Sequence, residues 1–578
     1  MYKYIKIFFS TLDKNYTKEL ILVFLMIFLS VFFDLVGIGM IIPLVNLLLD
    51  NEVSSKFGFL NPIIEFLGNP GKKDLLVYFV IFFLIMFLIK NIFLAILTWK
   101  KSYFTFSIAN FYAKKLLNNY LNKPYSFHIN NNSSKLINNL INETSLASGQ
   151  FILSLIDLVL ESLILLTLFM LLLFVEPQIT LIMSIIFLSC GSLYFILIKK
   201  RVLKFGYLRQ ITNNERLKLY NEALLNIKFH LIYKKTKKMI NGIFNNLDRI
   251  KLLNTEYIFL QNLPRLLFEY LIILIFCGVI MAYTLSNNQS IENLVPSLAL
   301  FSAASFRMLP SANKIIQRLQ NLRYSRSAIE LIYNELNDNT SKKPEKNKDV
   351  NLTFEKLTFK NVSFRYESKK DYLLEDISFN IEKDKIYGFI GATGSGKTTL
   401  TDLIMGLQKI DKGQIILNDN INLFEYKFSW QKLISYVPQK IFLQDDTIKN
   451  NIAFGEFEDE INEENFLSSI KSAQLEKFIS NLEDGCDTKI GEAGSKLSGG
   501  QIQRMGIARA LYVDPKILIF DEITSSIDVD TERQILEVVK KLKKNKTIIL
   551  ITHKPSTLEI CDEVYEVKNQ KVIKRQSK

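Results

Sequence analysis

The stretch with the clearest chemical meaning is a glycine-rich loop. It consists of Gly391, Ala392, Thr393, Gly394, Ser395, Gly396, Lys397 and Thr398, and it fits the pattern G-x-x-x-x-G-K-[ST]. Glycines allow the backbone to turn tightly and point its N–H groups inward, and a helix that starts at the loop adds partial positive charge. The loop therefore predicts a phosphate-binding site, in which Lys397 reaches the β- and γ-phosphates of a nucleotide and the Thr398 hydroxyl binds Mg²⁺.

Two consecutive carboxylates follow another apolar run. Residues 516–520 read Lys-Ile-Leu-Ile-Phe and precede Asp521 and Glu522. An acid at the end of a buried strand can hold Mg²⁺ directly or through water, and the next carboxylate can orient and deprotonate an attacking water molecule. Asp521 is therefore a predicted metal ligand, and Glu522 is the predicted catalytic base.

The order of three further features along the chain strengthens the prediction of a nucleotide site. Gln439 follows a strand-like run, and His553 follows the apolar run 547–551. Residues 497–501 (Leu-Ser-Gly-Gly-Gln) open a helix whose first N–H groups can face an anion. A single glutamine or histidine is usually an ordinary hydrogen-bonded residue, but in this order the positions together predict a nucleotide site.

The elements that must position these residues belong to an α/β fold. An apolar strand at 386–390 precedes the loop, and a helical run at 399–405 follows it. Strands and helices alternate over residues 351–578, which is typical of a parallel sheet covered by helices. Residues 331–350 are polar and lack periodicity, so they are predicted to be a linker.

The chain before the linker is much more apolar. Residues 1–330 contain six runs that each supply the roughly 20 residues a membrane-spanning helix needs. Lys and Arg gather at the N-terminus and in the connections 100–147 and 200–256, and basic residues favour the cytoplasmic side. The predicted fold class is a six-span α-helical transmembrane domain followed by an α/β P-loop nucleotide-binding domain. The runs lie near 20–48, 75–99, 148–175, 177–199, 257–283 and 292–321.

The net charge agrees with this membrane arrangement. It is +14, and hydrophobic residues make up 49% of the chain. The basic residues flank apolar runs without a basic–aromatic stripe for stacking bases, so no nucleic-acid partner is expected. The two long connections have helical periodicity on both sides of bends near 124–128 and 225–230. These bends either transmit movement between the membrane spans and the predicted nucleotide-binding domain in the cytoplasm, or the connections are merely solvated helices.

Basic residues within the predicted spans suggest a substrate cavity. A charge at mid-bilayer costs about 3 kcal/mol on insertion scales, so it usually faces a cavity or a partner. Lys90, Arg265 and Arg307 would together attract a phosphate or pyrophosphate head group. The alternative for Arg265 is an internal salt bridge with Glu269, four residues further along the same helix face.

The second half of the chain resembles the nucleotide-binding domain of ABC transporters over essentially its full length. Residues 391–398 match the Walker A motif, 497–501 the signature, 517–521 the Walker B motif, and 525–528 a D-loop in which the Asp is kept. This resemblance implies ATP and Mg²⁺ as cofactors. It implies that Tyr366 stacks on adenine and that the nucleotide is also contacted by the eight loop residues, Thr399, Ser498, Gly499, Gly500 and Gln501. It implies metal contacts from Thr398, Gln439 and Asp521. It implies catalytic roles for Glu522, His553, Gln439 and Lys397.

The first half resembles the six-helix membrane domain of exporters in the same family. One membrane domain with one nucleotide-binding domain implies a homodimer, in which Ser498 faces the γ-phosphate held by the other subunit. Segments 33–43, 263–270 and 306–311 are similar to bacterial lipid-linked oligosaccharide flippases. Arg265 and Arg307 lie in the matching segments, whereas Lys90 is a looser match because the family pattern suggests Arg there.

We therefore expect an ATP hydrolase coupled to transport, a multi-pass protein of a bacterial inner membrane with its nucleotide-binding domain in the cytoplasm. The expected substrate is a polyprenyl-pyrophosphate-linked oligosaccharide flipped to the outer leaflet, so the expected partners are a second copy of the chain, membrane lipid and the lipid-linked glycan. Two alternatives stay open. One is an ABC exporter of another lipid, a peptide or a drug, and the other is an ATP-gated channel or regulator.

Overall fold

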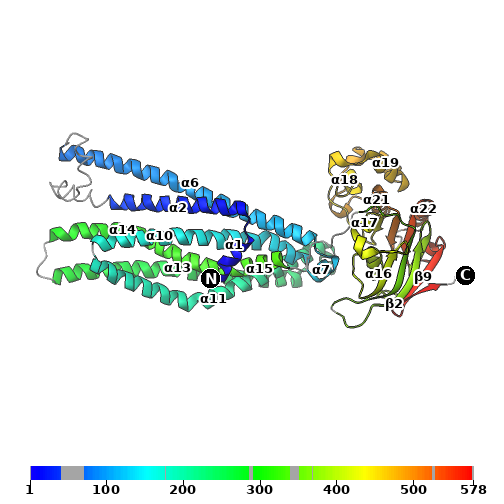
Figure 1. Cartoon of the computed structure of the whole chain (residues 1–578), viewed down its shortest axis with the longest axis horizontal. Coiled ribbons are helices and arrows are strands. Elements are labelled where there is room, and N and C mark those ends of the chain that lie inside the picture. Colours follow the sequence, from blue (N-terminus) through cyan, green and yellow to red (C-terminus); the bar gives the residue numbers. More distant parts are fainter. Residues whose placement is uncertain are drawn as a thin grey trace. The chain divides into compact units, whose positions relative to one another are not determined.

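The computed structural model describes residues 2–40, 71–175, 177–285, 291–338, 350–367, 369–523 and 528–575. Contacts within the chain divide it into two units. The first comprises Met1–Lys123 with Asn130–Thr340, and the second comprises Pro124–Ile129 with Ser341–Lys578. The first unit is helical and the second contains both strands and helices (Figure 1), in the order that the sequence predicts.

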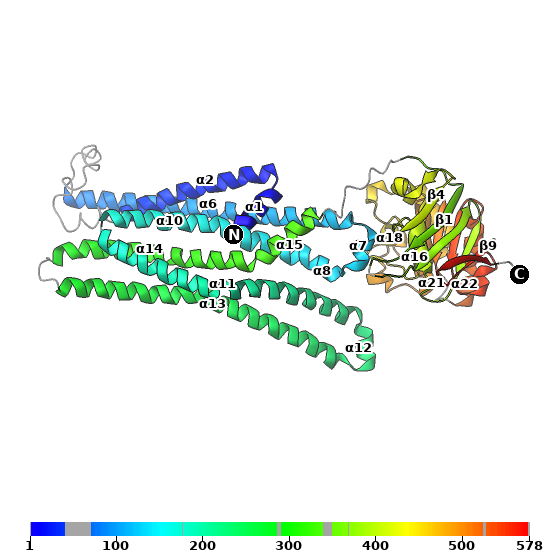
Figure 2. The ribbon, with the colours of Figure 1, turned by 60° about the horizontal axis from the view of Figure 1, so that its bottom comes forward.

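Long helices that run side by side form the first unit (Figures 1 and 2). Among the described residues, four stretches are long and apolar enough to cross a membrane: Lys14–Gly37, Lys73–Leu121, Ser133–Phe174 and Thr236–Gly278. The other two predicted spans fall in α11 and α14, and the side chains of α14 are described only from Met308 onward. The long helices are α2 (Lys14–Gly39), α6 (Lys72–Leu121), α10 (Leu153–Val175), α11 (Pro177–Leu225), α13 (Thr236–Leu285) and α14 (Ile291–Tyr324).

Three of these helices are far longer than a membrane span. Helices α6, α11 and α13 contain 50, 49 and 50 residues. At 1.5 Å per residue each is about 75 Å long, more than twice the hydrocarbon thickness of a bilayer. The short helices α7 (Tyr125–Asn130) and α12 (Ile227–Tyr233) lie at the two predicted bends. The helical character predicted on both sides of the two bends is therefore confirmed, and the helices run on beyond the spans.

Helix α15 (Arg326–Asn337) extends into the segment predicted as a linker. Its Ile329 and Ile332 are buried, and the Tyr4 hydroxyl of α1 (Tyr2–Thr11) donates to Glu330 Oε1 at 2.8 Å. Burial of one apolar face stabilises a helix here although the composition is largely polar. The ordered helix thus reaches Asn337 instead of ending before residue 331, and residues 339–349 lie outside the described residues.

Two sheets form the framework of the second unit. The larger has the strand order β10-β9-β3-β8-β7-β6, with β9 and β10 antiparallel and the other neighbours parallel. The smaller is antiparallel, in the order β2-β1-β4-β5. The strands are β1 (Lys356–Phe364), β2 (Leu374–Glu382), β3 (Ile386–Ile390), β4 (Lys412–Leu417), β5 (Ile421–Asn422), β6 (Ile434–Val437), β7 (Ile517–Asp521), β8 (Thr547–Ile551), β9 (Glu563–Lys568) and β10 (Lys571–Arg575).

The parallel strands bring the predicted site residues to one edge. Every residue of β7 and β8 is buried, as expected for nearly continuous apolar strands covered on both faces. Ligands of open parallel sheets bind outside the carboxyl ends of the strands, and the predicted loop, acids and histidine follow β3, β7 and β8. The helices of this unit are α16 (Lys397–Ile404), α17 (Lys427–Gln431), α18 (Ile448–Ile452), α19 (Glu463–Ser472), α20 (Glu476–Ser480), α21 (Gly499–Tyr512), α22 (Val529–Leu542) and α23 (Pro555–Leu558).

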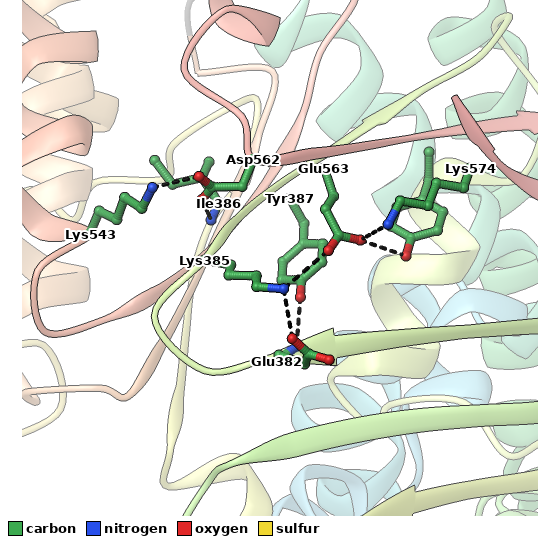
Figure 3. A network of polar contacts seen from close by, with 9 residues as sticks. Glu382, Lys385, Ile386, Tyr387, Lys543, Asp562, Glu563 and Lys574 are labelled. Carbon is green, nitrogen blue, oxygen red and sulfur yellow. Dashed lines mark hydrogen bonds and ion pairs between the residues drawn. The ribbon is translucent and has the colours of Figure 1, made fainter. Parts of the chain in front are cut away.

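A polar network fixes the opposite end of β3 (Figure 3). Lys385 Nζ donates to Glu382 Oε2 at 2.6 Å and to Glu563 Oε1 at 3.2 Å, and the Ile386 N–H donates to Asp562 Oδ2 at 2.8 Å. Hydrogen bonds to the two carboxylates raise the pKa of Lys385. Ion pairs that are partly exposed contribute little stability, so the main effect of the network is to align β2, β3 and β9.

Helix α11 closely approaches the end of α14 at Gly206. A Cβ added to Gly206 would overlap the Tyr324 carbonyl oxygen. The Ser327 hydroxyl donates to the Gly206 carbonyl oxygen at 3.4 Å. Because α14 ends at Tyr324 and α15 begins at Arg326, this contact holds the junction between the two helices.

We predict that Gly206→Ala destabilises the protein by about 1–3 kcal/mol, the usual cost of forcing extra volume into a packed contact. Gly242→Ala is the matched control, because Gly242 also lies in a long helix but has no atom within 4 Å of an added Cβ, and alanine favours the helix. Thermal unfolding of the detergent-purified protein measures both changes. A melting temperature for Gly206→Ala at or above that of Gly242→Ala would contradict the close contact.

Candidate active site

The glycine-rich loop joins β3 to α16. Gly391 has φ +157°, and a Cβ there would overlap the Val567 carbonyl oxygen, so the backbone path requires glycine. Lys397 folds back over the loop and donates to the carbonyl oxygens of Gly391 at 2.8 Å and Ala392 at 3.0 Å. Burial lowers the pKa of Lys397, whereas the nearby charges of Glu522 and Asp521 raise it. An ammonium group held in this way over a turn of backbone N–H groups is suited to an anionic ligand.

An aromatic ring is anchored beside the start of α16. The Tyr366 hydroxyl shares a hydrogen bond with Thr399 Oγ1 at 2.9 Å. Its ring meets the Phe364 ring edge-on, with 5.1 Å between the centroids. The structure thus brings together two residues that the sequence assigns to one nucleotide, and their contact holds the ring next to the phosphate-binding loop.

The loops after three neighbouring strands meet at Glu522. Gln439 Nε2 donates to Glu522 Oε2 at 2.6 Å, and His553 Nε2 lies 2.7 Å from Glu522 Oε1. The backbone of Glu522 has φ +48°, a left-handed conformation that is uncommon for residues other than glycine and often marks functional sites. Two of the predicted catalytic residues, Gln439 and His553, therefore both lie within hydrogen-bonding distance of the third, Glu522.

The adjacent acid, Asp521, lies in a poorly solvated position. Burial raises its pKa, the Glu522 charge raises it further, and a hydrogen bond from Tyr436 and the charge of Lys397 lower it. Asp402 in α16 is similar, since burial, followed by the charge of Asp521, raises its pKa to about 6. Acids in such surroundings favour a nearby cation.

The donor atoms here fit Mg²⁺. The predicted ligands, the Thr398 hydroxyl, the Gln439 side-chain oxygen and the Asp521 carboxylate, all offer oxygen, which this hard cation prefers. The burial of Asp521 and the charge of Glu522 beside it are a second reason to expect a cation. Mg²⁺ bound there would neutralise charge that develops on phosphate oxygens.

The signature residues form the start of α21. Ser498 Oγ accepts from the Gln501 N–H at 3.3 Å, and Gln501 Oε1 accepts from the Ser498 N–H at 2.8 Å, a capping box. Gly499 and Gly500 lie between them in the first helical turn, whose N–H groups have no partner within a helix. Ser498, Gly500 and Gln501 line a cavity of about 740 Å³ together with Arg504 and Thr531. Within the described ranges, no hydrogen bond or ion pair joins this cavity to the loop 391–398.

The D-loop is described only at its end. Asp528 Oδ1 accepts from the Thr531 N–H at 2.9 Å and caps α22. Residues 524–527 lie outside the described residues.

The candidate cavity residues of the first unit have separate environments. Lys90 is buried and lies 2.5 Å from Asp34, with its ammonium 4.8 Å from the centroid of the Phe87 ring. Arg265 is exposed and donates to Glu269 Oε1 at 2.7 Å, so the predicted internal salt bridge is confirmed. The side chain of Arg307 lies outside the described residues.

Sequence reasoning missed two sets of contacts. One is the hydrogen bond between the Tyr436 hydroxyl and Asp521. The other is an ion-pair cluster between helices: Asp157 pairs with Lys101 at 2.7 Å and with Arg318 at 2.9 Å, and Glu161 pairs with Lys314 at 2.7 Å. The spacing of four between the two acids and between Lys314 and Arg318 was the available signal, because it places each pair on one helix face.

Comparison with known families agrees with both halves of this arrangement. The ABC transporter transmembrane region matches residues 18–308, about half of the chain, and the ABC transporter domain matches residues 374–525. The chain belongs to the ABC transporter family. The predicted fold class, an exporter-type membrane domain followed by a nucleotide-binding domain, is confirmed. At the level of the family, the prediction of ATP hydrolysis coupled to transport is confirmed as well.

Curated relatives of this ABC transporter include ATP-dependent lipid A-core flippases. The one from Pseudoalteromonas atlantica is 28% identical over 529 residues, 89% of this chain and 88% of the relative. The one from Pasteurella multocida is 41% identical over 222 residues, which cover 38% of each chain. The similarity to the latter thus spans little more than a third of its length.

A solved structure shares the fold of this ABC transporter. A bacterial Atm1-family ABC exporter with ATP bound superposes with a TM-score of 0.77 over 97% of this chain and 95% of that chain. The two sequences are only 18% identical, so the likeness concerns the fold.

We predict that two substitutions of Tyr366 distinguish the contribution of its ring, through stacking on adenine, from that of its hydroxyl, through the hydrogen bond with Thr399. Tyr366→Ala removes the ring and weakens binding of a fluorescent ATP analogue by about tenfold, since stacking on an aromatic side chain is worth about 1–3 kcal/mol. Tyr366→Phe keeps the ring and loses only the contact with Thr399, so its affinity falls by about threefold or less. Equal loss in both variants would contradict stacking as the main contribution.

Proposed function

We propose that this ABC transporter is an ATP-driven flippase. It moves a polyprenyl-pyrophosphate-linked oligosaccharide to the outer leaflet of a bacterial inner membrane and works as a homodimer with cytoplasmic nucleotide-binding domains. The observation that carries its ATPase activity is the position of Glu522, held between Gln439 and His553 beside Asp521 and the lysine of the phosphate-binding loop.

The residues divide the work of hydrolysis among them. The loop N–H groups and Lys397 bind the β- and γ-phosphates and stabilise their charge. Glu522 accepts a proton from the attacking water, and Gln439 and His553 keep its carboxylate oriented. Tyr366 stacks on the adenine. Mg²⁺ held by Thr398, Gln439 and Asp521 supplies further charge neutralisation when it is bound.

The proposed homodimer completes the site. Among the described residues, no hydrogen bond or ion pair joins Ser498 to the loop of its own chain, and we assign the opposite partner of each to a second copy. In the dimer, Ser498 of one subunit would lie against the γ-phosphate bound by the other. Closure of the two domains around ATP would then be passed through α7 and α12 to the long helices.

Several features support a lipid-linked, anionic substrate. A cavity of about 570 Å³ lies among α10, α11, α13 and α14, and its lining is almost entirely apolar, with Phe169, Phe187 and Phe268 among the residues; such a lining suits a hydrocarbon chain. Because Lys90 is buried in its pair with Asp34 whereas Arg265 stays exposed beside Glu269, we assign the head-group contact first to Arg265 and Arg307. A lipid A-core glycolipid is the second candidate substrate, because relatives carry that name.

Two less specific functions remain to be separated from this one. Export of another lipid, a peptide or a drug would use the same fold. A channel or regulator gated by ATP would not need sustained hydrolysis, and the intact contacts of Glu522 favour turnover instead.

We predict that Glu522→Gln abolishes turnover while ATP binding is kept. Removing the catalytic base should lower steady-state ATPase activity by at least about a hundredfold, while the affinity for a fluorescent ATP analogue changes by less than about threefold. Glu537→Gln, an exposed residue of α22, is the matched charge-neutralising control and should keep its activity. Unchanged turnover in Glu522→Gln would remove this residue from its role.

We predict that Arg265→Ala combined with Arg307→Ala abolishes glycolipid flipping and leaves basal ATPase activity. The assay uses proteoliposomes with a defined lipid-linked oligosaccharide, a lipid A-core glycolipid, a plain phospholipid and a peptide in separate arms. Lys218→Ala with Lys251→Ala removes two other exposed, carboxylate-paired cations and should flip normally. Flipping that persists in the arginine double variant would refute the head-group assignment, and the arm with the highest rate identifies the substrate class.

A further inference from the structure

Tyr436 connects β6 to the carboxylate at the end of β7. Its hydroxyl donates to Asp521 Oδ2 at 3.1 Å. The two strands are parallel neighbours, with Tyr436 paired to Ile519 and Val437 paired to Phe520. The Tyr436 side chain therefore reaches along the edge of the sheet to the first residue beyond that pairing.

Each of the two consecutive acids receives a hydrogen bond from the same segment. Tyr436 contacts Asp521, and Gln439, three residues later, contacts Glu522 at 2.6 Å. The first acid is the predicted metal ligand, and the second is the proposed base. The β6 segment thus holds both carboxylates, one donor for each, while the rest of the site approaches from β3 and β8.

A donor to one carboxylate oxygen has a definite physical effect. It fixes the rotation of the group about its last side-chain bond and leaves the second oxygen for another partner. Hydrogen bonds to a charged acceptor are stronger than neutral ones, and partners that orient metal ligands commonly change metal affinity when they are removed. Asp402 and Glu522 add negative charge around Asp521, so the carboxylate also gains from a donor that keeps it in place.

We propose that Tyr436 is a positioning residue for the cation that binds with ATP. Its hydroxyl holds one oxygen of Asp521 so that the other remains available to Mg²⁺. This inference rests on the proposed ATP-hydrolysing function. It adds to that function a residue that acts through the predicted metal ligand Asp521.

The test measures cation binding directly. Full-length protein in detergent is mixed with a non-hydrolysable ATP analogue and titrated with Mn²⁺, and electron paramagnetic resonance reports free and bound Mn²⁺. Tyr436→Phe removes only the hydroxyl, so we expect Mn²⁺ affinity to fall about tenfold. The Mg²⁺ concentration for half-maximal ATPase activity should rise by a similar factor, with the maximal rate within about twofold of the unchanged protein.

Tyr565→Phe is the matched control. The Tyr565 hydroxyl donates to Glu563 Oε2, also at 3.1 Å. Glu563 belongs to the network at the other end of β3 (Figure 3). Both variants lose one tyrosine–carboxylate hydrogen bond, so their melting temperatures should be similar, but Tyr565→Phe should bind Mn²⁺ normally.

The outcomes distinguish this inference from the proposed function. Normal Mn²⁺ affinity in Tyr436→Phe, or an equal loss in both variants, overturns the positioning role while the ATPase assignment stands. Absence of nucleotide-dependent Mn²⁺ binding in the unchanged protein overturns both. A loss confined to Tyr436→Phe, with the maximal ATPase rate retained, supports the positioning role.

Discussion

The carboxylate of Glu522 is the contact on which the arrangement of the site depends. Gln439 and His553 reach it from the loops after β6 and β8, so one side chain joins three neighbouring strand ends. Its left-handed backbone costs about 1–3 kcal/mol, and the fully buried strand before it holds that conformation. The two consecutive acids at this turn also have different partners. Asp521 accepts from Tyr436 of β6, whereas Glu522 is contacted by the flanking loops.

The two ends of β3 have different roles, one in the predicted nucleotide site and the other in aligning the strands. At one end of β3 the chain turns through the glycine-rich loop, and at the other end Lys385 and Asp562 bind neighbouring elements (Figure 3). Contacts at the second end are partly exposed ion pairs and a backbone hydrogen bond to Asp562. They set the alignment of the strands, and the ion pairs contribute little energy. Contacts at the first end bury charge and shift pKa values, as for Asp402, and such groups are typical of functional sites.

In the helical unit, buried charges are compensated mainly by neighbouring helices. Asp34 pairs with Lys90, and Asp157 pairs with both Lys101 and Arg318. An unpaired charge in apolar surroundings is costly, so these pairs favour one relative placement of α2, α6, α10 and α14. The buried cations thus have partners on another helix. Arg265 differs, because its partner Glu269 lies one turn away on the same helix and the Arg265 side chain stays exposed.

The sequence by itself determined the phosphate-binding loop, the order of the site residues and the apolar character of the long helices. Each of these is a local pattern: glycine spacing fixes a backbone path, and an unbroken apolar run favours removal from water. Only the tertiary structure decided that Tyr436 contacts Asp521, that Lys90 pairs with Asp34 and that α15 continues to Asn337. The two contacts, and the packing that stabilises α15, join residues distant in sequence. A helix or strand that is apolar on every face does not encode which face meets which neighbour.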